Sequence, residues 1–232
     1  MKRKKIYQPF QFKQFAIEHN NCVMKIGTDG VLLGAWCDIT NCLTALDIGT
    51  GTGVIAIMLA QRSQAIVYGV EINKAAYEQA KDNMNRSPWA KRLQVKFGDI
   101  QKVMDQLKPS FDLIVSNPPF FSSGTPSPDP NKNAVRHTLT LTHSNLLRIC
   151  SLLLSNNGKI CLILPLEEGR KSIETAKEYA LFCTKITYVK SRIKQPPHRV
   201  LLQFEKNTSY QKEENELIIY CLLYTSPSPR DS

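Results

Sequence analysis

The sequence predicts an α/β protein with a doubly wound, mostly parallel sheet of seven strands, an antiparallel hairpin at the edge of the sheet and a further hairpin at the N-terminus. Short apolar runs of strand length alternate with runs of helical length from residue 43 to residue 180. A glycine-rich segment, Gly49–Gly53, joins the first of these strands to the next helix. Residues 182–190 and 199–205 are two further apolar runs without a helix between them, which indicates the edge hairpin.

At 232 residues the chain is long enough for one α/β domain with an appendage. The formal net charge of +10 favours nucleic acid or an anionic membrane surface as a partner, with a merely soluble basic protein as the alternative. No apolar run is long enough to span a membrane or to act as a leader, so we expect a cytoplasmic protein without a membrane partner. The seven cysteines include no Cys-x-x-Cys pair, which predicts reduced core thiols and no metal site.

The first 30 residues are expected to form a basic arm and the N-terminal hairpin. Residues 1–14 carry five cations among aromatic residues, which suits either RNA contact or a solvated tail: Lys2, Arg3, Lys4, Lys5 and Lys13. Apolar residues alternate from Phe15 to Ile26 on both sides of His19-Asn20-Asn21, which predicts the hairpin. Thr28 or Asp29 then suits the N-cap of a helix through Val31–Trp36, although a role for these residues at a bound cofactor is equally open.

The glycine segment follows a buried strand, Leu43–Ile48, and precedes a helix, Val54–Ala60. Its spacing is Gly-x-Gly-x-Gly with Asp47 two residues ahead, and it has neither the third glycine of the dinucleotide motif nor the lysine of the triphosphate motif. An adenosyl ligand without phosphate therefore fits this loop better than a dinucleotide or a nucleoside triphosphate does. The next strand, Ala65–Val70, ends in Glu71, where a carboxylate binds a ribose diol in related folds; a solvated strand-end Glu is the alternative.

The third and fourth strands also end in polar residues. A helix over Asn73–Arg86, capped by Asn73, leads to the strand Leu93–Phe97. Asp99 after this strand could accept a hydrogen bond from an adenine amino group and Ile100 could pack on the base, with a simple turn Asp as the alternative.

The fourth strand, Phe111–Ser116, ends in Asn117-Pro118-Pro119-Phe120. The Asn side chain and a backbone carbonyl offer two acceptors for a planar NH2 group, while Phe120 can stack on the attached ring. Accepting both hydrogens makes the nitrogen a nucleophile toward an electrophilic methyl group. A strand-ending turn with a buried Phe is the alternative.

The rest of the chain continues the same pattern. The polar segment 122–130 is expected to be a lid or substrate loop, and Arg136 and His137 after it are candidates for substrate binding. Helices are expected at residues 146–154 and 167–180, and strands at residues 158–165, 182–190 and 199–205. Residues 216–220 are a candidate for a last strand. The segment Lys185–Lys206 carries six cations and one anion, which suits either RNA contact or protection of a sheet edge.

With these residues in place, the chain resembles the class I S-adenosylmethionine-dependent methyltransferases of the Asn-Pro-Pro-aromatic type, and within them the bacterial tRNA (adenine-N6)-methyltransferases. The motifs that carry the likeness are Phe12–Phe15, Met24–Trp36, Leu46–Gly53 and Asn117–Phe121. The resemblance implies a Rossmann-like fold, S-adenosylmethionine as cofactor, and methylation of an adenine amine of tRNA beside the anticodon.

The resemblance also implies a role for individual residues. Asp47, Gly49 and Gly51 would line the methionine side, Glu71 would bind the ribose, and Asp99 and Ile100 would hold the adenine. The target amine would be oriented by Asn117, Pro118, Pro119 and Phe120, with Asn117 also bordering the cofactor. Lys25, Asp29, Arg136 and His137 are the candidates for substrate binding.

Two departures leave alternatives open. The family most often has Tyr where this chain has Phe120, which keeps the stacking surface but lacks a hydroxyl, and Phe is also familiar in guanine-N2 enzymes. A guanine-N2 RNA enzyme, a glutamine-N5 protein methyltransferase and an idle RNA-binding module therefore remain alternatives. We expect an arm and hairpin at residues 1–30, a methyltransferase domain at 31–220 that works as a monomer, and a tail at 221–232 that lies outside the fold and does not resemble the family's ending.

Overall fold

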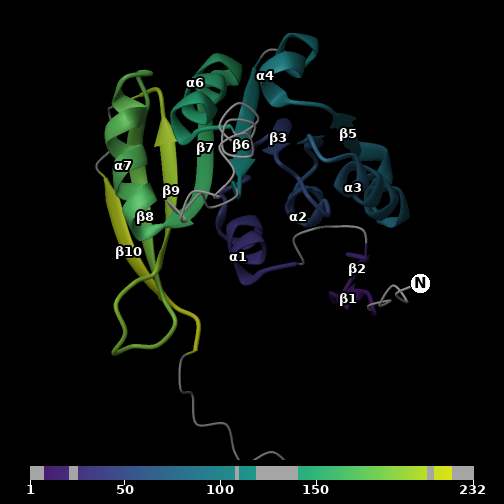
Figure 1. Cartoon of the computed structure of the whole chain (residues 1–232), viewed down its shortest axis with the longest axis horizontal. Coiled ribbons are helices and arrows are strands. Elements are labelled where there is room, and N and C mark those ends of the chain that lie inside the picture. The colour runs from purple at the N-terminus through teal and green to yellow at the C-terminus, as the bar shows by residue number, and fades with distance from the viewer. Residues whose placement is uncertain (1–7, 21–25, 108–109, 119–140, 208–211, 221–232) are drawn as a thin grey trace, which may run out of the picture.

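The computed structural model describes residues 8–20, 26–107, 110–118, 141–207 and 212–220 (Figure 1). In this part of the chain the main sheet has eight strands in the order β10-β8-β9-β7-β6-β3-β4-β5. The predicted fold class is confirmed. The strand beyond the predicted seven is β10 (Glu213–Ile218), which pairs in parallel with β8 and therefore covers the hairpin that was expected at the edge.

The central strands all run in one direction. β3 (Thr44–Ile48) pairs in parallel with β4 (Ile66–Glu71) and β6 (Phe111–Ser116), while β4 pairs with β5 (Leu93–Phe97) and β6 with β7 (Leu154–Pro165). The strands β8 (Phe182–Lys190) and β9 (Arg199–Glu205) form the predicted antiparallel hairpin, which joins the sheet through β7 and β9. The carboxyl ends of β3 to β8 consequently lie at one edge of the sheet.

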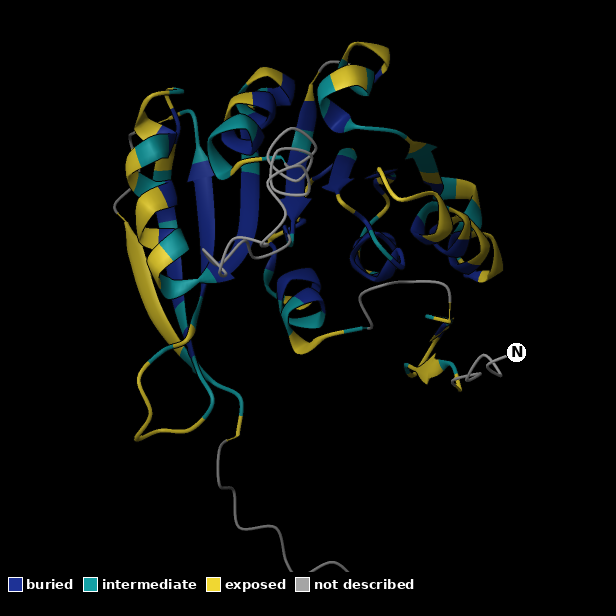
Figure 2. Cartoon of the chain, in the orientation of Figure 1, coloured by how far each residue is buried: buried dark blue, intermediate teal, exposed yellow. Residues whose placement is uncertain are grey.

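Helices cover both faces of the sheet. Alternate strand residues point to opposite sides, and the apolar residues on each side are buried under helices. One core contains Ala45 and Leu113 with residues of α1 (Thr28–Trp36), α2 (Val54–Arg62) and α3 (Lys74–Arg86). The other contains Leu46 and Ile114 with residues of α4 (Ile100–Val103), α6 (His143–Leu153) and α7 (Leu166–Lys177). Two short 3-10 turns, Ala90–Arg92 and Met104–Gln106, complete the connections. Buried residues fill the central strands and the helix sides that face them (Figure 2).

The N-terminal hairpin differs from the one expected. β1 (Phe10–Gln11) pairs antiparallel with β2 (Ala16–Ile17), so the turn lies before Phe15 rather than at His19-Asn20-Asn21. The aromatic rings favour this earlier turn, because Phe12 stacks on Phe15 with centroids 4.4 Å apart and Phe15 packs edge-on against Trp89. Residues 21–25, which were expected in the second strand, lie outside the described residues.

The helix caps bear out one prediction and correct another. Asn73 caps α3, since its side chain accepts a hydrogen bond from the Ala76 amide at 3.1 Å. The cap of α1 is Gly27, which has no side chain to donate or accept, so the prediction of Thr28 or Asp29 as N-cap was wrong. Both residues lie in the first turn instead, where the charge of Asp29 suits the positive end of the helix dipole.

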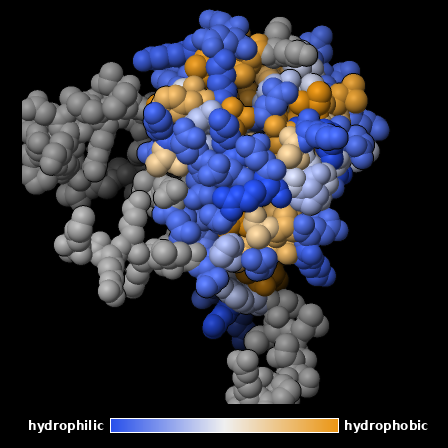
Figure 3. Space-filling model, turned by 90° about the vertical axis from the view of Figure 1, so that its right-hand side faces the viewer, coloured by the Kyte–Doolittle hydropathy of each residue, from blue (hydrophilic) through white to orange (hydrophobic). Residues whose placement is uncertain are grey.

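The cysteines that the structure describes are all free, and Cys37, Cys42, Cys150 and Cys161 are buried, as predicted for core thiols. Among the described helices, none has the length and apolarity needed to cross a membrane. The side of the molecule beyond α3 and β5 is mostly hydrophilic, with apolar side chains scattered over it (Figure 3). Such scattered residues are normal on a protein surface.

Candidate active site

The predicted site residues lie where the strand order of the sheet reverses. The chain runs outward from β3 through β4 to β5 and then returns to β6 on the other side of β3. In doubly wound sheets this reversal leaves a crevice outside the carboxyl ends of the two neighbouring strands. Asp47 belongs to β3, Glu71 ends β4, and Asn117 directly follows β6.

The glycine loop after β3 has a backbone that only glycine adopts readily. The φ angles are +74° at Gly49, +57° at Gly51 and +82° at Gly53. The amides of Gly49 and Thr50 both donate to the Val70 carbonyl, at 2.9 and 3.1 Å, which fixes the loop to the end of β4. A Cβ on Gly49 would meet no atom within 4 Å, so the loop has an open side on which a ligand can approach the backbone.

Asp47 is fully buried and short of hydrogen-bond donors. The Thr50 hydroxyl donates to its Oδ2 at 2.6 Å, whereas its Oδ1 is buried and has no hydrogen-bond partner among the described residues. Burial raises the pKa of Asp47 to about 7; the Thr50 hydroxyl and the Ala56 backbone amide act in the opposite direction, and the nearby charge of Glu71 acts in the same direction as burial. A buried carboxylate with an unused oxygen is suited to receive a cationic or N–H-bearing ligand group.

Glu71 is buried rather than solvated, so the alternative of a solvated strand-end Glu is wrong. Its Oε2 accepts from the Gly51 amide at 2.9 Å and its Oε1 from the Asn73 amide at 2.8 Å. The carboxylate therefore holds the glycine loop against the start of α3. Each of its oxygens still has capacity for a further hydrogen bond, so the same group can accept from a ligand hydroxyl.

The residues after β5 are used by the fold itself. The Oδ1 of Asp99 accepts from the Gln101 amide at 3.0 Å and so caps α4. Ile100 is 4% exposed and packs in the second core. The Oδ2 of Asp99 accepts only a long hydrogen bond from the Gln101 side chain, at 3.5 Å, and can still accept from a ligand, whereas Ile100 has little surface left to pack on a base.

Asn117 places a buried side-chain oxygen directly after β6. The Ser116 hydroxyl donates to the Ile48 carbonyl at 2.8 Å, which joins the ends of β6 and β3 just before it. The Oδ1 of Asn117 is buried and has no hydrogen-bond partner within the described residues. Its Nδ2 lies 3.9 Å from the position that a Cβ on Gly30 would occupy, so α1 packs beside it. Pro118 is buried, and Pro119 and Phe120 lie outside the described residues.

The structure connects Asp29 to Arg199, which the sequence indicated only as one of the six cations of the basic segment Lys185–Lys206. The Nε of Arg199, the first residue of β9, lies 2.9 Å from the Oδ2 of Asp29, and both side chains are largely buried. Since the two residues are 170 positions apart, no local pattern could have indicated the pair. The other substrate-binding candidates, Lys25, Arg136 and His137, and the predicted lid at 122–130 lie outside the described residues.

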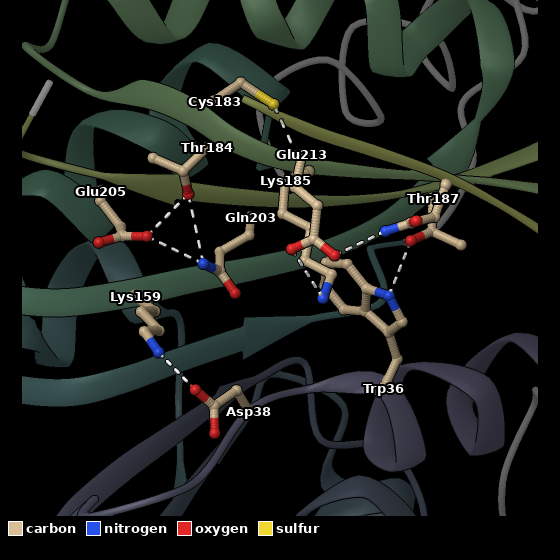
Figure 4. Close-up of polar contacts among 11 residues, drawn as sticks. Trp36, Asp38, Lys159, Cys183, Thr184, Lys185, Thr187, Gln203, Glu205 and Glu213 are labelled. Atoms are coloured by element: carbon tan, nitrogen blue, oxygen red, sulfur yellow. Dashed lines mark hydrogen bonds and ion pairs between the residues drawn. The ribbon is translucent and has the colours of Figure 1, made fainter. Parts of the chain in front are cut away.

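A polar cavity of about 360 Å³ lies at the opposite edge of the sheet (Figure 4). Two ion pairs lie around it: Lys159 with Asp38 at 2.6 Å, and Lys185 with Glu213 at 3.2 Å. Glu205 accepts from Thr184 on β8 and from Gln203 on its own strand, β9. The charged groups of this cavity are thus engaged with other residues of the protein, and no group of three or more possible metal ligands occurs among the described residues. We therefore place the candidate site at the glycine loop and Asn117.

Comparisons with known proteins show the family to which the chain belongs. Residues 39–215 match a family described as a methyltransferase domain. The chain is 43% identical to the tRNA1(Val) (adenine(37)-N6)-methyltransferase of Histophilus somni (strain 2336), over 92% of this chain and 89% of the relative. It is 42% identical to the protein of the same name from Haemophilus influenzae (strain ATCC 51907), over 91% and 90%. Among solved structures, a predicted O-methyltransferase from Agrobacterium tumefaciens has a TM-score of 0.66 at 19% identity, covering 88% of this chain and 93% of the other, which shows a shared fold.

Proposed function

Because the chain belongs to the methyltransferase domain family that includes the tRNA1(Val) (adenine(37)-N6)-methyltransferases, we propose that it transfers a methyl group from S-adenosylmethionine to the N6 amino group of an adenine in tRNA. Adenine 37 of tRNA1(Val) is the first position to test, since the relatives are named for it. We also propose that the enzyme acts as a cytoplasmic monomer.

The observation that carries this proposal is the buried Oδ1 of Asn117, which has no hydrogen-bond partner among the described residues and lies at the carboxyl edge of β6, where the sheet order reverses beside the glycine loop. A buried acceptor without a donor is unfavourable by about 1–3 kcal/mol, unless a ligand supplies the missing hydrogen bond. An exocyclic amine has two N–H groups and satisfies this acceptor directly.

The residues around the loop fit S-adenosylmethionine. The Oδ1 of Asp47, which has no hydrogen-bond partner among the described residues, suits the ammonium of the methionine end, and the open side of Gly49 suits close approach of a ligand to the backbone. Glu71 stands at the end of β4 with spare acceptor capacity for ribose hydroxyls. Asp99 would accept from the adenine amino group, although Ile100 is too buried to contribute much surface.

Bound S-adenosylmethionine supplies an electrophilic methyl group, and the rest of the task falls to the protein. The Asn117 Oδ1 and a backbone carbonyl of the Asn-Pro-Pro turn accept the two hydrogens of the target amine, which draws its lone pair out of conjugation with the ring. Phe120 would stack on the base and hold it in plane. No strong base is needed, because the nitrogen loses its proton more easily once it has been alkylated.

The test is methyl transfer from labelled S-adenosylmethionine to unmodified tRNA1(Val), followed by nucleoside analysis, with Asn117→Ala as the control. Label in N6-methyladenosine supports the proposal. Label in N2-methylguanosine would support the guanine enzyme instead, and label only in protein glutamine would support a protein methyltransferase. Cofactor binding without any transfer would leave an idle RNA-binding module.

A further inference from the structure

Most of the positive charge of the basic segment Lys185–Lys206 is neutralised by contacts with other residues of the protein. Of its six cations, Lys185 pairs with Glu213 at 3.2 Å and Lys190 with Glu216 at 2.6 Å, both through β10. Arg199 pairs with Asp29, and the Nζ of Lys206 donates to the Leu154 carbonyl at 2.7 Å. These four cations are already engaged in holding the fold together.

The two cations that remain are Arg192 and Lys194. Both are exposed on the connection between β8 and β9, and no carboxylate among the described residues pairs with either. The Gln195 amide donates to the Arg192 carbonyl at 3.0 Å, which closes a turn that includes both cations, and the His198 amide donates to Val189 at 3.1 Å at the base of the connection. Ile193 between them is 61% exposed. The turn thus presents two cations to solvent from a hydrogen-bonded backbone.

The turn lies at the same edge of the sheet as Asn117. β8 ends at Lys190 and runs parallel to β7, so its carboxyl end shares the edge of β6 and β7. In Figure 1 the connection extends beyond that edge, on the side of the sheet where β8, β9 and β10 lie. Across the sheet, the end of β8 lies three strand spacings of about 4.8 Å each, or roughly 14 Å, from the end of β6. The pairing register also places Lys190 three residues, or about 10 Å, further along the strand direction than Asn117. A nucleic acid with one base at Asn117 would therefore reach the turn with nucleotides a few positions away from that base.

We propose that the turn Arg192–Gln195 binds phosphates of the tRNA that flank the methylated base, an inference that rests on the proposed function. Two exposed cations near a site for a polyanion match phosphate groups in charge. The paired lysines of β8 do not share this role, because their charges are balanced by β10.

The experiment measures tRNA affinity at several salt concentrations for the wild type and for Arg192→Ala with Lys194→Ala. Two phosphate contacts on single-stranded RNA contribute about 0.7 each to the slope of log K against log salt, so the slope should become shallower by about 1.4. The KM for tRNA should rise while kcat and cofactor affinity stay the same. Arg192→Lys with Lys194→Arg keeps both charges and should keep the wild-type slope.

The matched control is Arg170→Ala with Lys177→Ala on α7, which removes the same charge from residues already paired with Glu167 and Glu174. An equal loss of slope in this control would overturn the inference, because the effect would then be one of total charge. An unchanged slope in the turn variant of an enzyme that methylates tRNA would also overturn it, without touching the proposed function. A wild type that does not methylate tRNA would refute the proposed function itself.

Discussion

Replacing Asp47 by Asn should remove a pH dependence that this one buried carboxyl group gives to the stability of the protein. The substitution keeps the size of the side chain and an oxygen that can accept from Thr50. It removes the charge that burial and Glu71 disfavour. The variant therefore separates the titration of Asp47 from its packing.

The sign follows from the raised pKa of Asp47. The unfolded carboxyl group releases its proton near 3.8, whereas the folded one holds it up to about 7. The stability that comes from holding this proton is complete below about pH 4 and is lost as the pH rises to about 7. The difference between the two pKa values corresponds to about 4 kcal/mol in the free energy of unfolding. Wild type should thus lose about 4 kcal/mol relative to Asp47→Asn between pH 4 and pH 8.

Urea unfolding of both proteins without cofactor, at half-unit steps from pH 4 to pH 8, measures this difference. His143 has a lowered pKa because of burial and contributes a slope of opposite sign below about pH 6.5, but it does so in both proteins and cancels. Only the difference between the two curves matters, so a constant loss of stability from the buried amide does not affect the result. Parallel curves would refute the reasoning, since Asp47 would then titrate normally in the folded state.

The other predictions concern residues of the same edge. Asn117→Ala should lower kcat by ~10²–10³ with cofactor affinity nearly intact, by analogy with loss of an oxyanion-hole donor; turnover at the wild-type rate would exclude Asn117 from the chemistry. Glu71→Ala should weaken cofactor binding roughly 10- to 150-fold in calorimetry and destabilise the protein by about 1–3 kcal/mol for each backbone amide left without an acceptor; unchanged affinity would remove it from the ribose site. A double-mutant cycle on Asp29 and Arg199, measured by denaturation, should give a coupling energy of about 1 kcal/mol, because the pair is largely but not fully buried; a coupling of zero would mean that the pair does not hold α1 in place.

The parallel strands could be predicted from the sequence because each is a short, mainly apolar run; β3 and β6 are mostly buried, whereas β5, at the edge of the sheet, has exposed residues at Gln94 and Phe97. The expected ranges Leu93–Phe97 and Phe111–Ser116 match the observed strands, since both runs have clear polar or glycine boundaries. β10 was indicated only as a candidate at Glu216–Tyr220, because its first four residues are exposed and show no apolar alternation. Its place depends on pairing with β8 and on ion pairs to Lys185 and Lys190, which no local pattern reveals.

The candidate site could be predicted only in part from the sequence, for a similar reason. The positions of Asp47, Glu71 and Asn117 follow from strand ends, and strand ends can be recognised locally. Their hydrogen bonds cannot, because they depend on how the loops meet: the contact of Glu71 with the Gly51 amide joins two segments that are 20 residues apart. The sequence overstates the positive charge that the segment Lys185–Lys206 has free for RNA, because the carboxylates that pair with its cations come from β10 and α1, elsewhere in the chain.

The hydrogen bonds of the glycine loop also couple the two ends of the proposed cofactor site. Thr50 donates to Asp47 and the next residue, Gly51, donates to Glu71, so one short loop joins both carboxylates. Two buried acids in such proximity repel each other when both are ionised, which is one reason why the pKa of Asp47 is raised.

An ammonium group bound at Asp47 would offset that repulsion and favour ionised Asp47. Binding at neutral or lower pH should then release a proton, and the cofactor should stabilise the protein more at pH 8 than at pH 5. Calorimetry in buffers of different ionisation enthalpy measures the proton release, and its absence would mean that the ligand's cation is bound elsewhere.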